Sequence, residues 1–137
     1  MDRALQDLVW QRAHRRCEYC GFPAEWAYQP FQLDHIIAES HHGQTVSGNL
    51  ALSCFDCNTY KGPNLAGIDS ETEEVTRLYH PRRDRWQTHF FWDGPVLVGR
   101  TSVGRATIDV LRINHPDAVS VRRLLLALGE SLEPQTE

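Results

Sequence analysis

The sequence predicts an α+β fold, and three features of the 137-residue chain support that prediction. Its four cysteines stand in two Cys-x-x-Cys pairs that are separated by a long insertion. Short apolar and β-branched runs in the insertion are typical of strands, and a helical pattern includes the second pair. The second half contains a hairpin pattern followed by two helical patterns. We therefore expect helices and small sheets within one compact domain.

The first 62 residues are predicted to contain two helices separated by strands and a loop. Apolar residues recur at helical spacing over residues 3–16, which predicts an amphipathic helix. Residues 25–37 favour two short strands with a break near Pro30, and residues 39–49 form a polar loop. The stretch LALSCFDCNTYKG predicts a short lead-in and a helix that ends at Gly62.

Residues 63–137 are predicted to form a C-terminal hairpin-and-helix extension that packs on residues 1–62. A polar connection over residues 63–76 contains a weak hairpin pattern, and PRRDRWQTHF indicates a short helix or turn. In FFWDGPVLVGR, two apolar runs flank Asp-Gly-Pro, which predicts a hairpin. Two helices follow, one from Gly104 and one that begins near Pro116 and ends at Gly129.

Bulk composition narrows the class of protein. No run is long or apolar enough to span a membrane, and the charged N-terminus lacks a signal-peptide core, so we expect a cytoplasmic protein. The net charge of −4 argues mildly against a tight, non-specific nucleic-acid binder. Arginines nevertheless cluster locally, at residues 12–16 and 77–85, where a solvated face is the alternative to a binding surface.

The two cysteine pairs predict a structural zinc site. Cys17, Cys20, Cys54 and Cys57 supply four thiolates, the ligand set of tetrahedral Zn²⁺. Two intervening residues allow a turn or a helix start to point both sulfurs of a pair at one ion. A redox Cys-x-x-Cys or buried free thiols are the alternatives, and two pairs in so short a chain disfavour both. Structural zinc contributes roughly 10–16 kcal/mol in small modules, enough to hold an irregular first half together.

Residues of a recognisable order lie within this zinc frame. Asp34 and His35 end an apolar run, and Asn49, Asn58 and Lys61 follow on a loop and a helix. This arrangement resembles the HNH endonuclease family in its zinc-bearing form, whose catalytic unit is a ββα-metal motif. The matching stretches are Leu33-Asp34-His35-Ile36-Ile37, the Gly43 loop, Asn49-Leu50, and Cys54-x-x-Cys57-Asn58 followed by Lys61. The stretch ESHHG departs from the Pro- and double-Gly-rich loop common in the family.

The resemblance implies a metal-dependent endonuclease that hydrolyses nucleic-acid phosphodiester bonds, and we expect DNA as the substrate. It implies that His35 is the general base, a role that suits an imidazole near neutral pH. It further implies that Asp34 and Asn58 hold a catalytic Mg²⁺ or Mn²⁺, for which their oxygen atoms are suitable donors. Asn49 would fix the loop and the imidazole. On a strand, Asp34 and His35 point to opposite faces, so both reach one site only if the strand end relaxes.

Contacts with the nucleic-acid backbone are expected from Lys61, Arg82, Arg83 and Arg85. For Lys61 the alternative is a helix C-terminal lysine that complements the dipole. Two other functions remain open for the whole chain: a zinc-stabilised nucleic-acid-binding module that does not cleave, and a structural or protein-interaction domain with zinc only. The sequence leaves the recognition site, the strandedness of the substrate and the oligomeric state undecided.

Overall fold

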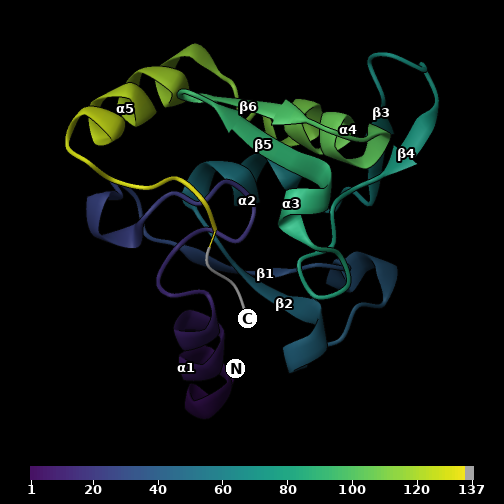
Figure 1. Cartoon of the computed structure of the whole chain (residues 1–137). Coiled ribbons are helices and arrows are strands. Elements are labelled where there is room, and N and C mark those ends of the chain that lie inside the picture. Colours follow the sequence, from purple (N-terminus) through teal and green to yellow (C-terminus); the bar gives the residue numbers. More distant parts are fainter. Residues whose placement is uncertain (135–137) are drawn as a thin grey trace.

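The computed structural model describes residues 1–134 and confirms a mixed helix-and-strand architecture with three small sheets (Figure 1). Each sheet is an antiparallel pair of strands. The helices and strands, in chain order, are α1 (Arg3–Arg12), β1 (Gln32–His35), β2 (Leu50–Ser53), α2 (Phe55–Lys61), β3 (Ala66–Ile68), β4 (Val75–Arg77), α3 (Trp86–His89), β5 (Phe90–Asp93), β6 (Val96–Gly99), α4 (Ser102–Leu111) and α5 (Pro116–Ala127).

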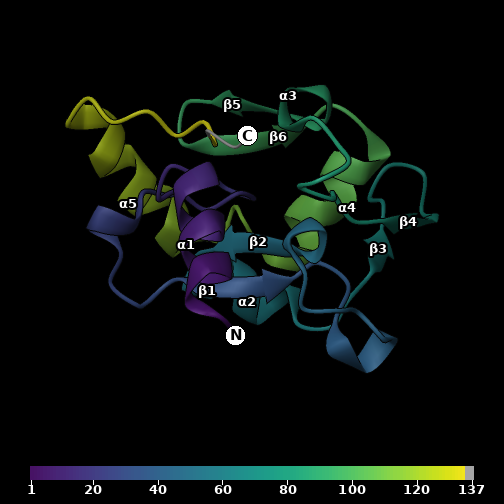
Figure 2. The same cartoon turned by 90° about the horizontal axis from the view of Figure 1, so that it is seen from below.

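The first half is built on the β1–β2 pair, which contacts α1 through β2 and α2 through β1 (Figure 2). Helix α1 ends at Arg12, earlier than the predicted residue 16, because His14 and Arg15 take left-handed backbone angles that turn the chain toward the first cysteine pair. Of the two strands expected over residues 25–37, only β1 forms. Residues Ala24–Trp26 form a 3₁₀ turn instead, because the backbone just before them bonds to the first cysteine loop and Arg15.

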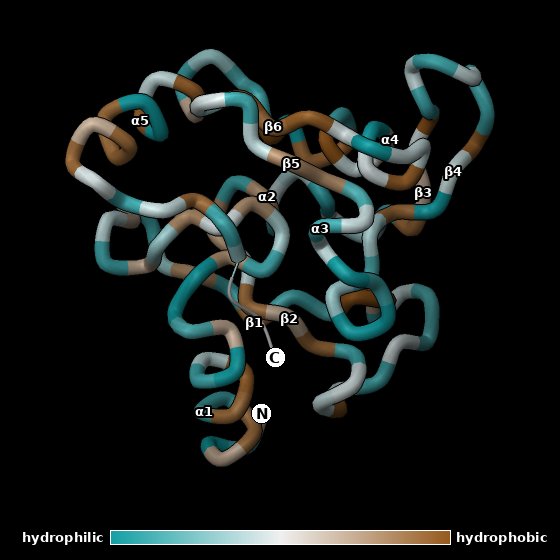
Figure 3. The backbone as a smooth tube through the Cα atoms, viewed as in Figure 1, coloured by the Kyte–Doolittle hydropathy of each residue, from teal (hydrophilic) through white to brown (hydrophobic). Residues whose placement is uncertain are grey.

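The second half confirms the predicted hairpins and helices. The weak hairpin pattern corresponds to β3 and β4, and the Asp-Gly-Pro hairpin corresponds to β5 and β6. Helix α4 packs against β3, β4 and β6, while α5 extends to the other side of the β5–β6 pair (Figure 1). Helix α5 buries Arg122 and Leu125. Figure 3 shows that β2 and β6 are mainly hydrophobic, whereas the β3–β4 tip is mainly polar.

One hydrophobic core runs through both halves, from Val9 and Leu50 to Tyr79 and Leu97. After α5 the chain returns to the first half, where Arg16 donates to the carbonyl of Ser131. Trp92 of β5 donates to the carbonyl of the next residue, Leu132. Gly21 lies so close to this returning segment that a Cβ there would meet the Leu132 carbonyl. Within residues 1–134, no helix has the length and apolar character required to cross a membrane.

Candidate functional site: a cysteine cluster beside a strand–loop–helix unit

The four cysteines gather into one cluster. Their sulfur atoms all lie within 4.8 Å of one another, and the Sγ atoms of Cys20 and Cys54 are 3.8 Å apart. Tetrahedral zinc with Zn–S bonds of about 2.3 Å requires sulfurs separated by about 3.8 Å. The donor set and its spacing therefore fit a Zn²⁺ ion held by Cys17, Cys20, Cys54 and Cys57.

Within each cysteine pair, the backbone amide of the second cysteine donates a hydrogen bond to the sulfur of the first. The amide of Cys20 donates to the sulfur of Cys17, and the amide of Cys57 donates to the sulfur of Cys54. Cys54 is the N-cap residue of α2, so its sulfur replaces the oxygen that usually caps a helix. The cluster thereby fixes the start of α2 against the first cysteine loop.

Asp34 points into the protein interior and is 5% exposed. Its carboxylate accepts a 2.6 Å hydrogen bond from the hydroxyl of Tyr19, and the ammonium of Lys61 lies 3.3 Å and 3.2 Å from its two oxygens. Burial raises the pKa of Asp34, while Lys61 and Tyr19 oppose that rise. The same burial and the neighbouring Asp34 charge raise the pKa of Tyr19 well above its usual value.

Lys61 is 2% exposed, so its ammonium lies inside the protein. Besides Asp34, it donates to the carbonyl oxygens of His35 and Ile36 at 3.2 and 3.1 Å. Lys61 thus joins the end of α2 to the end of β1. The contacts of Lys61 in this structure are internal, and its contact with a phosphate stays a prediction.

His35 points away from Asp34, toward the loop that follows β1. Its Nε2 lies 2.8 Å from the hydroxyl of Thr45 and 3.9 Å from a carboxylate oxygen of Glu39. The His35 side chain is 19% exposed, so solvent reaches the imidazole. The alternation of a β-strand therefore separates the two side chains, and the structure does not bring His35 and Asp34 to one point.

Asn49 holds the base of the same loop together. Its side-chain oxygen accepts from the amide of Ile37, and its amide group donates to the carbonyls of Ile37 and Gln44. These three bonds close the loop over residues 37–49, which carries the Thr45 hydroxyl that meets His35. Asn49 is buried and contacts the loop backbone rather than the imidazole.

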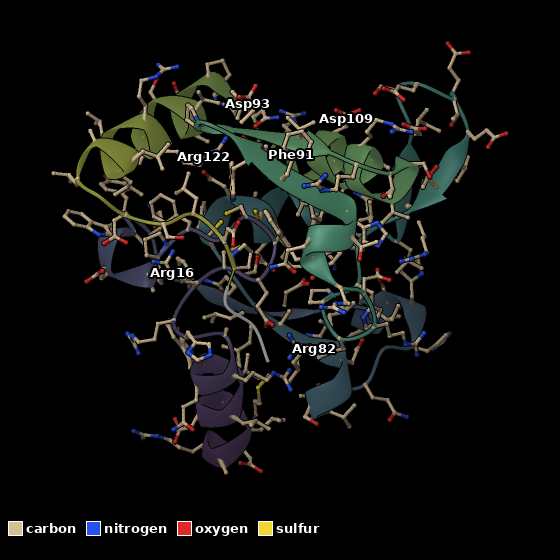
Figure 4. The ribbon with its side chains drawn as sticks, viewed as in Figure 1. Arg16, Arg82, Phe91, Asp93, Asp109 and Arg122 are labelled. Atoms are coloured by element: carbon tan, nitrogen blue, oxygen red, sulfur yellow. The ribbon has the colours of Figure 1, made fainter. Side chains whose placement is uncertain are left out.

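Asn58 lies on α2 one turn before Lys61 and is partly exposed. Within residues 1–134, no hydrogen bond engages its side-chain amide, so its oxygen is available to a ligand. The three arginines proposed for backbone contacts fall into two groups. Arg83 and Arg85 are exposed. Arg82 forms an ion pair with the buried Glu18 and lies beneath α3, on the side that faces the first half (Figure 4).

Three residues around the predicted site were not identified from the sequence: Tyr19, Glu39 and Thr45. Glu39 follows His35 by four residues, a spacing that could have indicated it. Tyr19 lies inside the first Cys-x-x-Cys pair, where a bulky aromatic residue gives no sign of contact with a carboxylate 15 positions later.

Comparison with known proteins agrees with this geometry. Residues 17–64 match the family model described as HNH endonuclease. This segment contains both cysteine pairs and the β1–loop–β2–α2 unit. The chain is 25% identical to Septu protein PtuB from Bacillus thuringiensis over 118 aligned residues. The aligned segment covers 85% of this chain and 43% of that protein. The chain therefore spans less than half the length of this relative. No solved structure matches it. Such a domain indicates a nuclease or a related nucleic-acid function, and residues 17–64 of this chain are an HNH endonuclease domain.

Proposed function

We propose that the chain is a metal-dependent endonuclease that hydrolyses phosphodiester bonds in DNA, with His35 as the general base. The observation that supports this function is the position of His35 within the HNH domain. Its imidazole ends β1, is accessible to solvent, and lies against the loop that Asn49 closes. A partly exposed imidazole held in one orientation is suited to remove a proton from an attacking water.

Thr45 and Glu39 would orient the imidazole of His35. Because the Thr45 hydroxyl can either donate to Nε2 or accept from it, this contact restricts the ring without fixing its tautomer. In the proposed reaction, His35 accepts a proton from a water molecule while the water oxygen bonds to phosphorus. The bond between phosphorus and the 3′-oxygen breaks, and the leaving 3′-oxygen takes up a proton from solvent. The products would carry a 5′-phosphate and a 3′-hydroxyl. General-base assistance of this kind is typically worth 10²–10⁴-fold in rate.

Asp34 and Asn58 are the proposed holders of a catalytic Mg²⁺ or Mn²⁺. Their carboxylate and amide oxygens fit the preference of such ions for oxygen ligands, and the amide of Asn58 is not engaged by residues 1–134. Asp34 uses one lone pair for Tyr19 and shares the rest with Lys61. Lys61 would therefore compete with a divalent ion at this carboxylate. When bound, such an ion supplies charge that stabilises the phosphate and the leaving oxygen.

Cleavage of supercoiled plasmid tests the proposal directly. Zinc-loaded protein should yield relaxed or linear DNA only with added Mg²⁺ or Mn²⁺. His35→Ala should lose this activity while keeping its zinc content and its fold. His41→Ala is the matched control, since His41 is an exposed histidine of the same loop, and it should retain cleavage.

Two results would reject parts of this proposal. Full activity of His35→Ala would remove His35 from the role of base. Absence of product with every ion, in protein that still binds zinc and DNA, would identify the chain as the non-cleaving binding module instead.

A further inference from the structure

A cleft of about 380 Å³ opens beside the end of β1, outside the groups proposed for catalysis. It lies between three segments: the residues that follow His35, the end of α2 with the turn after it, and residues 77–84 of the extension. The apolar lining of the cleft comes from all three segments and consists of Ile36, Ile37, Leu65 and Leu78. Ile36 directly follows His35 in the chain, whereas the imidazole of His35 points toward Thr45 on the loop after β1.

The charges around the cleft do not cancel. Lys61 is neutralised by Asp34, which it contacts at 3.2 Å. Arg77 is neutralised by Asp84, to which it donates two hydrogen bonds of 2.7 and 3.0 Å. Arg83 is exposed, and no carboxylate of residues 1–134 forms an ion pair with it. The cleft therefore carries one uncompensated positive charge, at Arg83.

His80 also lines the cleft and offers a hydrogen-bond donor. Its Nδ1 accepts from the amide of Arg82, so the neutral ring carries its proton on Nε2. Burial, followed by the nearby Arg83 charge, lowers the pKa of His80 and favours this neutral form. The Nε2–H group can then donate to an anion in the cleft.

Residues 80–84 hold these groups in a fixed turn. The Asp84 carboxylate accepts from the amide of His80, and the carbonyl of His80 accepts from the amides of Arg83 and Asp84. The end of the turn is anchored by Arg77, which pairs with Asp84, and by the buried Trp86 that follows. Arg83 and His80 are therefore presented by a preorganised backbone, which lowers the entropic cost of binding.

We propose that this cleft binds one nucleotide of the nucleic-acid substrate. Its phosphate would contact Arg83 and His80, and its sugar and base would pack on the apolar lining, which includes Leu65 and Leu78. This inference rests on the proposed function, because it assumes a nucleic-acid substrate. An apolar lining and a single cationic group are complementary to a nucleotide, which has an aromatic base and an anionic phosphate.

Fluorescence anisotropy with a labelled DNA oligonucleotide tests the cleft separately from cleavage. Binding is measured on zinc-loaded protein without added Mg²⁺ or Mn²⁺, over a range of salt concentrations. Arg83→Ala should weaken binding about fivefold and reduce the slope of log K against log salt by about one. Arg83→Lys should restore the slope, because it restores the charge. Arg123→Ala, which removes an exposed arginine of α5 away from the cleft, should match wild type.

A second variant tests the apolar lining of the cleft. Leu65→Ala should weaken binding roughly threefold through lost apolar contact, and it should leave the salt slope unchanged. If Leu65→Ala binds DNA as wild type does, the nucleotide does not enter the cleft and the inference is wrong. If Arg83→Ala keeps both the affinity and the slope of wild type, or if the wild-type protein binds no DNA, the inference is also wrong.

Plasmid cleavage measured on the same proteins separates the two proposals. Cleavage by wild type together with unchanged binding by Arg83→Ala would overturn the cleft and leave the nuclease intact. Absence of cleavage together with loss of binding in Arg83→Ala and Leu65→Ala would keep the cleft as a nucleotide site in a binding module.

Discussion

Replacing Lys61 by methionine should cost the protein a large part of its stability. The substitution keeps the approximate length and volume of the side chain but removes an ammonium that is 2% exposed. That ammonium lies 3.2 Å from the nearer oxygen of Asp34 and donates to the carbonyls of His35 and Ile36. The buried carboxylate would keep only the hydroxyl of Tyr19 as a partner. Removing one member of a buried ion pair costs about 3–5 kcal/mol.

Urea unfolding of zinc-loaded protein, followed by tryptophan fluorescence, measures this loss. The double variant Lys61→Met with Asp34→Asn should recover part of the stability, since it leaves no unpaired charge inside. Arg123→Met controls for the loss of a surface cation and should change the free energy of unfolding by less than about 0.5 kcal/mol. An exposed ion pair contributes up to about 1 kcal/mol. If Lys61→Met lowers the free energy of unfolding by less than this, the buried ion pair of Lys61 does not hold α2 to β1 and the reasoning is wrong.

Three further predictions concern the metal cluster, the loop and one ion pair of the extension. Cys57→Ser should lower the zinc content from one ion per chain, measured by atomic absorption, and should reduce the stability of the first half; unchanged zinc would contradict the four-cysteine site. Asn49→Ala should lower plasmid cleavage while zinc stays bound, because three loop hydrogen bonds are lost; wild-type activity would show that the loop is held by other contacts. Asp69 accepts two hydrogen bonds from Arg105, which lower the pKa of Asp69 below its usual value. A pKa that is lower in the folded state than in the unfolded state stabilises the fold at pH values above the unfolded pKa, and this contribution is lost on acidification. The stability difference between wild type and Asp69→Asn should therefore be constant at neutral pH and shrink below about pH 4. A difference that grows on acidification, in unfolding curves at several pH values, would contradict this assignment.

The parts of the fold that the sequence predicted are those set by local chemistry. The four cysteines could be grouped because a tetrahedral zinc site takes four thiolates, and α2 could be bounded because Gly62 stops it. The hairpin of β5 and β6 followed from Asp-Gly-Pro between two apolar runs. Each of these signals acts within a few residues or through a single shared ligand.

The parts that could not be predicted depend on contacts between distant residues. From the sequence, Lys61 could equally be a phosphate contact or a lysine that complements the helix dipole. Its burial is decided by Asp34, which lies 27 positions earlier. Arg82 belongs to the same cluster of arginines as Arg83, yet only Arg82 meets an acid from the first half, at Glu18. The pattern of neighbouring residues cannot distinguish an arginine that faces a buried carboxylate from one that faces solvent.

The return of the chain to the first cysteine loop affects the order in which native contacts form during synthesis. All four cysteines lie within residues 17–57 and precede the extension, so metal can be captured before most of the extension has been translated. The contact between Arg16 and Ser131, however, spans 115 positions, and such long-range closures form late. Until then Gly21 and the backbone around it stay open to water. Amide hydrogen exchange at this loop should consequently report the docking of Ser131 and Leu132 rather than the binding of metal.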